Sequence, residues 1–329
     1  MGENADQILP VIFSIEGPEL TDNEKALFKQ ANPLGFILFT RNCETPEQVL
    51  ALTQSLQEVV ERKCPVLIDQ EGGRVQRLKP PIWRGYPAAR TFGVKAEHDL
   101  EGALSDIRFR TMQISEELRE SGINVNCDPC LDVLQPDTHE VIGDRAYSND
   151  PDIVGRLSLA ICRHYLSSGI TPVIKHLPGH GRARADSHKE LPRVDARAEE
   201  LEIDFKPFQI LAESDVADAI WAMPTPVLYP TLDPDHAACA SPKIIQEIIR
   251  GKIGFQGILL SDALDMEGFA AYGDAAGRVN AVLDAGCDLA CHCTGKFDEM
   301  KKIAESVPNL SSEAQKRLQK AADSRTLAA

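Results

Sequence analysis

The feature that most constrains the fold of this sequence is a repeated alternation of short apolar runs with longer amphipathic stretches. Eight runs have the length and the residue types of β-strands. They cover residues 11–17, 35–39, 66–70, 123–133, 171–176, 219–223, 257–261 and 287–293. Eight strand–helix units predict an α/β protein with a single-domain (β/α)8 TIM barrel fold. A doubly wound open sheet stays as the alternative, because it shows the same alternation.

The stretches between these runs predict the helices of the barrel. Several begin after Thr, Asp or Ser in an N-cap position and end near glycine. The predicted helices cover residues 24–32, 45–63, 100–121, 151–168, 241–252 and 274–285. Since no internal repeat or Gly/Ser-rich linker divides the chain, we expect one catalytic domain over residues 1–329, with a helical C-terminal tail from about residue 297.

Charge and composition exclude several classes of partner. The chain has 50 acidic and 35 basic residues and a net charge of −15, so it should repel the phosphates of nucleic acids and anionic membranes. It has neither a run of 18 apolar residues nor the basic-then-apolar order of a signal peptide. We therefore expect a cytoplasmic protein whose nine cysteines are reduced and whose partner is a small molecule.

Polar residues follow several predicted strands at their carboxyl ends, where barrel enzymes place their active sites. Asp69 and Arg77 lie in and after the third strand, and Lys175 and His176 end the fifth. These four are candidates for ligand binding, although Asp69 could instead cap a turn. Arg145, after the fourth strand, could clamp a substrate hydroxyl or carboxylate, or form an ordinary loop salt bridge.

Two further positions have acid–base or nucleophilic chemistry. Asp186 precedes His188 by two residues in a Gly- and Arg-rich loop, so it can orient that imidazole and raise its basicity. Asp262 follows the seventh strand, where a carboxylate can attack a substrate covalently. Asp265 and Glu267 lie beyond the strand, so we expect them to face solvent or to cap the next helix.

Three groups of residues have the composition of metal ligands: Cys127 with Cys130, Cys287 with residues 291–293, and His176 with His180 and His188. The first two lie in predicted strands, where alternate side chains face opposite sides, and no second CxxC completes a zinc site. We therefore favour buried structural cysteines and expect no metal and no cofactor. A metal-dependent hydrolase using the three histidines and a Schiff-base aldolase using Lys175 remain alternatives.

Five segments together resemble the family 3 glycoside hydrolases, in particular the cytoplasmic single-domain β-N-acetylglucosaminidases (NagZ type) of bacterial peptidoglycan recycling. These segments are residues 68–77, 143–145, 175–181, 186–188 and 261–266, in the family's order. The resemblance covers most of the chain and also implies a (β/α)8 barrel. Two positions depart from the family pattern, because Ala263 stands where a second Asp is frequent, and residues 222–226 lack a frequent histidine.

The resemblance implies a role for each site residue. Asp262 matches the nucleophile, His188 the acid/base and Asp186 the partner of that histidine. The residues that match positions holding the N-acetylglucosamine unit are Asp69, Arg77, Arg145, Lys175 and His176. The implied enzyme is a monomer that removes N-acetylglucosamine from GlcNAc-anhydroMurNAc fragments, with or without peptide. A phosphorylase and a chito-oligosaccharide hydrolase are the nearest variants.

A nucleophilic carboxylate and an acid/base together imply hydrolysis with retention of configuration through a covalent glycosyl-aspartate. In such enzymes the two groups lie about 5–5.5 Å apart. The unperturbed pKa of histidine, about 6.5, lies near cytoplasmic pH, so His188 can act first as an acid and then as a base.

Overall fold

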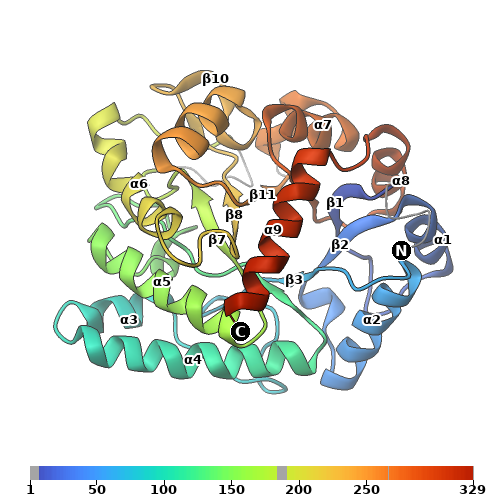
Figure 1. Ribbon diagram of the computed structural model, residues 1–329, viewed down its shortest axis with the longest axis horizontal. Helices are drawn as coiled ribbons and strands as arrows, with labels where there is room; N and C mark the ends of the chain where they lie inside the picture. Colours follow the sequence, from blue (N-terminus) through green and yellow to red (C-terminus); the bar gives the residue numbers. More distant parts are fainter. Residues whose placement is uncertain (1–6, 184–190, 266, 329) are drawn as a thin grey trace.

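Eight parallel strands close into a barrel in the computed structural model, which describes residues 7–183, 191–265 and 267–328 (Figure 1). In spatial order the strands are β1 (Leu9–Phe13), β12 (Leu289–His292), β11 (Ile258–Ala263), β8 (Trp221–Pro224), β7 (Thr171–Leu177), β6 (Val125–Asn126), β3 (Val66–Ile68) and β2 (Pro33–Leu38). The pairing of β1 with β12 closes the ring. The predicted (β/α)8 barrel is thus confirmed, and the alternative prediction of a doubly wound open sheet is wrong.

Helices surround the strands (Figure 1). They are α1 (Asp22–Ala31), α2 (Pro46–Val59), α3 (Ala89–Ala96), α4 (Leu100–Glu120), α5 (Pro151–Ser167), α6 (Ala198–Ala212), the π-helical segment η4 (Ile244–Ile253), α7 (Ala275–Ala285), α8 (Phe297–Ser306) and α9 (Ser312–Ala328). Short 3-10 turns are η1 (Thr40–Asn42), η2 (Gly143–Arg145), η3 (Ala238–Ala240) and η5 (Glu267–Tyr272). None of the helices described is long and apolar enough to cross a bilayer.

The strand residues alternate between two hydrophobic clusters. In β7, Val173 belongs to the cluster inside the barrel and Ile174 to the cluster between strands and helices. This alternation follows from the two-residue period of a strand. Both faces of each strand are therefore buried, which explains why the strands read as continuous apolar runs.

Helix α9 closes the amino-terminal end of the barrel. Ala314 of this helix and the preceding Leu310 are buried in the interior cluster. Arg317 donates to Asp288 at 2.7 Å, just before β12, and Arg325 contacts Thr171 at the start of β7. Because this end is covered, a ligand can enter the barrel mouth only at the carboxyl ends of the strands.

Several predicted strands are shorter in the structure, and the fourth and the third show why. The fourth was predicted over residues 123–133, but β6 ends at Asn126, and only an isolated bridge joins Cys130 to Lys175. Pro129 lacks the N–H that a continued ladder needs. The third strand ends at Ile68, and the chain then forms a hairpin of β4 (Gln70–Gly72) and β5 (Val75–Gln76). A second small hairpin joins β9 (Leu228–Tyr229) to β10 (Asp233–Ala237).

Candidate active site

A pocket of about 470 Å³ lies at the carboxyl ends of the strands, opposite α9. Its volume is within the usual range for small-molecule sites. All the predicted substrate-binding residues and the predicted nucleophile line it, namely Asp69, Arg77, Arg145, Lys175, His176 and Asp262. Side chains outside the predicted sugar-binding set also line it, among them Arg41, Arg74, His180, Asp265, Cys291 and Cys293. Ala263 and Met223, at the two departures from the family pattern, belong to the same wall.

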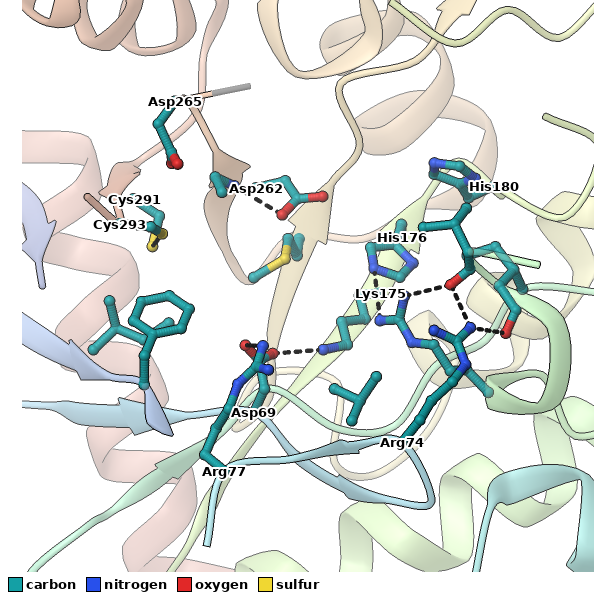
Figure 2. Close-up of a pocket in the computed structure, with 18 of the residues that line it drawn as sticks. Asp69, Arg74, Arg77, Lys175, His176, His180, Asp262, Asp265, Cys291 and Cys293 are labelled. Atoms are coloured by element: carbon teal, nitrogen blue, oxygen red, sulfur yellow. Dashed lines mark hydrogen bonds and ion pairs between the residues drawn. The ribbon is translucent and has the colours of Figure 1, made fainter. Parts of the chain in front are cut away.

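A chain of ion pairs forms one side of the pocket, and Figure 2 shows the contact between Lys175 and Asp69. The Lys175 ammonium lies 2.8 Å from a carboxylate oxygen of Asp69 and 2.7 Å from one of Glu71. Arg77 donates to the other oxygen of Asp69 at 3.0 Å. Arg145 contacts both oxygens of Glu71, at 2.9 and 2.7 Å. Two carboxylates thus share three cations, and each acid is fixed in orientation by two partners.

These partners determine the protonation states. Burial opposes ionisation of Glu71, but Arg145 and Lys175 outweigh it and lower the pKa of this carboxyl from 4.5 to about 2. Burial likewise opposes the charge on Lys175, but Asp69 and Glu71 raise its pKa above the ordinary value. Lys175 is therefore an ammonium ion at neutral pH. A Schiff-base aldolase needs a free amine, so the structure disfavours that alternative.

The depressed pKa of Glu71 predicts a loss of stability in acid. The unfolded chain binds a proton at this carboxyl near pH 4.5, whereas the folded chain resists until about pH 2, so the free energy of unfolding should fall as the pH drops through this window. Urea unfolding between pH 6 and 3 measures this slope. Glu71→Gln should be less stable at neutral pH and should show a shallower slope. If the free energy of unfolding fell equally steeply with pH in both proteins, Glu71 would not be the group that causes the loss of stability.

Asp132 positions His176, and the sequence analysis gave it no role. Its carboxylate lies 2.7 Å from Nδ1 of His176 and also accepts the backbone N–H of His180 at 2.6 Å. Nε2 of His176 lies 3.4 Å from the guanidinium of Arg145, which can only donate. Nε2 is therefore the acceptor, and Nδ1 carries the proton that is donated to Asp132.

The histidines do not need a metal to explain their arrangement. Ligand atoms of Cys130, Asp132 and His176 lie within 4.8 Å of one another, but all three side chains are buried and Asp132 hydrogen-bonds to both neighbours. The rings of His176 and His180 are 5.7 Å apart, and burial lowers the pKa of His180 to about 4. The third histidine of the predicted metal group, His188, is in residues 184–190, which lie outside the described residues.

The carboxylate of Asp262 projects into the pocket from the end of β11 (Figure 2). One oxygen accepts the backbone N–H of Ala263 at 2.7 Å. In the part of the chain that the structure describes, no cation forms an ion pair with this carboxylate, in contrast to Asp69 and Glu71. Asp265 is exposed to solvent, as expected, and it also borders the pocket, which we did not expect. The cap of α7 is Asp274.

The predicted acid/base pair cannot be placed. Asp186 and His188 both lie in residues 184–190, outside the described residues, so their roles and the expected 5–5.5 Å separation from Asp262 stay predictions.

The (β/α)8 barrel has a sugar-sized polar pocket, and no cation in the described ranges pairs with its strand-end carboxylate, Asp262, which is compatible with a glycoside hydrolase. The sequence matches the glycosyl hydrolase family 3 N terminal domain over residues 3–326. The chain belongs to glycoside hydrolase family 3, as the sequence motifs predicted.

Relatives and solved structures agree with this assignment. The chain is 36% identical to a β-hexosaminidase of Bordetella avium (strain 197N) over 286 residues, which cover 86% of this chain and 80% of the relative. It is 34% identical to a β-hexosaminidase of Aromatoleum aromaticum over 318 residues, 94% of this chain and 86% of the relative. The structure of NagZ from Neisseria gonorrhoeae in complex with N-trifluoroacetyl-D-glucosamine has a TM-score of 0.85 at 30% identity and covers 96% of this chain and 90% of its own.

Proposed function

We propose that this chain is a retaining β-N-acetylglucosaminidase that removes terminal N-acetylglucosamine from peptidoglycan fragments. One observation carries the proposal: a pocket at the mouth of a barrel whose other end is covered by α9 holds the carboxylate of Asp262, which has no ion-pair partner among the described residues, beside a fixed array of charges proposed to bind the sugar. A closed pocket admits the end of a glycan and not its middle, which favours release of a terminal sugar. The β-hexosaminidase relatives and the match to NagZ support the choice of sugar.

The geometry divides the work between two sides of the pocket. Asp69, oriented by Lys175 and Arg77, presents a carboxylate that can accept bonds from sugar hydroxyls. His176, oriented by Asp132, offers an imidazole on the same side. Asp262 then attacks the anomeric carbon from β11, and the glycosidic oxygen leaves with a proton. Water completes hydrolysis with net retention.

His188 is the proposed proton donor, and Asp186 is proposed to orient it. His188→Ala should lose at least about 100-fold in kcat/KM on a natural disaccharide, because an alkoxide leaving group needs a proton in the transition state. The loss should be much smaller on a substrate with a phenolate leaving group. Steady-state kinetics with both substrates measure the difference. Equal losses on the two substrates would argue against the acid role.

Product analysis tests the whole proposal. We expect the enzyme to hydrolyse a chromogenic β-N-acetylglucosaminide, with the β-anomer of N-acetylglucosamine appearing first by NMR. A first-formed α-anomer, or no turnover, would refute it. Adding inorganic phosphate distinguishes the phosphorylase, which would give a sugar phosphate. Comparing GlcNAc-anhydroMurNAc with chito-oligosaccharides distinguishes a chito-oligosaccharide hydrolase. We expect the higher kcat/KM on the peptidoglycan disaccharide.

We also propose that the chain acts as one catalytic domain, as a monomer and in the cytoplasm. The family match over residues 3–326 and the net charge of −15 support this view. Light scattering of the purified protein tests the monomer, and a dimer mass at micromolar concentration would exclude it.

A further inference from the structure

Two thiols lie side by side on the wall of the sugar pocket. Cys291 lies in β12 and Cys293 lies two positions later, just after the strand, so their side chains project to the same side. Their sulfur atoms are 3.5 Å apart, and both side chains line the pocket (Figure 2). His292 projects to the opposite side, toward Glu299. The pair therefore belongs to the pocket and not to the helical shell.

More sulfur surrounds this pair. Met223, at the end of β8, lines the same pocket. Cys127, just after β6, is in the same interior cluster and is close enough to interact electrostatically with both thiols. Three thiols and a thioether thus belong to one interior cluster, and the proposed mechanism uses none of them.

We propose that Cys291 and Cys293 bind one soft d10 cation, such as Zn²⁺ or Cd²⁺, and that the bound cation blocks the sugar pocket. Thiolate and thioether ligands select such cations over Mg²⁺ or Ca²⁺. A tetrahedral zinc with bonds of about 2.3 Å places two sulfur ligands roughly 3.8 Å apart. The observed 3.5 Å needs little adjustment. This inference is independent of the identity of the sugar.

The charges around the pair are compatible with a cation. The carboxylates of Asp262 and Asp265 line the same pocket. Arg41 opposes a cation, but its guanidinium is held by the backbone oxygen of Cys293 at 2.8 Å and by Ser14 at 2.6 Å. Binding converts two Cys–SH groups and one M²⁺ into a metal dithiolate and releases two protons.

The same thiols should react poorly with alkylating agents. Both side chains are buried, with Cys291 1% and Cys293 8% exposed, so an alkylating agent reaches them poorly. A metal ion is smaller than iodoacetamide and has easier access to the pair. Rapid inactivation by cadmium together with slow inactivation by iodoacetamide is therefore the expected pattern.

A cadmium titration of the whole enzyme tests the site. We expect an ultraviolet cadmium–thiolate absorption that saturates at one equivalent, release of two protons, and loss of chromogenic activity that a chelator restores. The double variant Cys291→Ser/Cys293→Ser should lose the absorption, and Cys293→Ser alone should weaken binding by at least about 100-fold. The absorption and the proton release do not depend on activity, and circular dichroism checks that each variant is folded. Cys43→Ser is the matched control, since Cys43 does not line the pocket.

The titration also separates this site from the buried group of Cys130, Asp132 and His176, which offers only one thiolate. Loss of the absorption in Cys130→Ser, or its persistence in the double variant, would overturn the proposal. So would the absence of saturation below millimolar cadmium. Full activity with cadmium bound would overturn the claim that the cation blocks the pocket.

Discussion

Asp262→Asn is expected to lower kcat by at least about 1,000-fold, because an amide cannot form the glycosyl ester. The fold should survive, since within the described residues this carboxylate accepts a hydrogen bond from the backbone of Ala263 alone, and an asparagine oxygen can accept it too. Sugar binding should survive as well, because the ion pairs of Asp69 and Glu71 do not involve this residue. Kinetics with a chromogenic substrate and calorimetry with N-acetylglucosamine measure the two effects.

Asp265→Asn is the matched control for this experiment. Asp265 lines the same pocket three residues further along the chain, so the variant has the same change of charge. It should retain far more activity than Asp262→Asn. If Asp262→Asn kept activity within tenfold of the parent, or if Asp265→Asn were the more damaged enzyme, Asp262 would not be the nucleophile.

Lys175→Met is expected to lower the free energy of unfolding by about 3–5 kcal/mol at neutral pH, in addition to abolishing sugar binding. The ammonium is fully buried between Asp69 and Glu71, and removing it leaves each buried acid with only its arginine partner, Arg77 or Arg145. Without Lys175, burial makes protonation of the two acids easier. The difference in free energy of unfolding between Lys175→Met and the parent should therefore become smaller as the pH falls from 7 to 5. Urea unfolding at both pH values measures this difference.

An exposed lysine is the control for this stability effect. Lys206 forms an ion pair with Asp152 at 2.6 Å, but both side chains are about half exposed. Lys206→Met should therefore change the free energy of unfolding by at most about 1 kcal/mol. A similar small effect of Lys175→Met would show that the buried cluster does not hold the pocket together.

The sequence predicted the barrel and the end of it that carries the site. Each apolar run ends at the same mouth, so Asp69, Lys175 and Asp262 could be expected to meet although they are far apart in the chain. The partners of these residues could not be predicted. Glu71 and Asp132 follow apolar runs in the same way as Asp69, but their contacts with Lys175 and His176 depend on how neighbouring strands pair.

The local errors have physical causes. Pro129 interrupts the predicted fourth strand, because a ladder needs an N–H at each alternate residue. Asp265 is exposed past the end of β11, as expected, but sequence spacing does not show that the chain still borders the pocket there. Alternation in the last strand did predict that Cys291 and Cys293 face one side and His292 the other. It could not show that the cysteine side is the pocket.

Trapping the covalent intermediate tests the central claim most directly. A fluorinated N-acetylglucosamine derivative with an activated leaving group slows breakdown of the glycosyl-enzyme, so that the protein can be quenched, digested and sequenced by mass spectrometry. We predict a single sugar adduct on Asp262. An adduct on another carboxylate, or complete turnover of the natural disaccharide with inversion and no adduct, would contradict the mechanism.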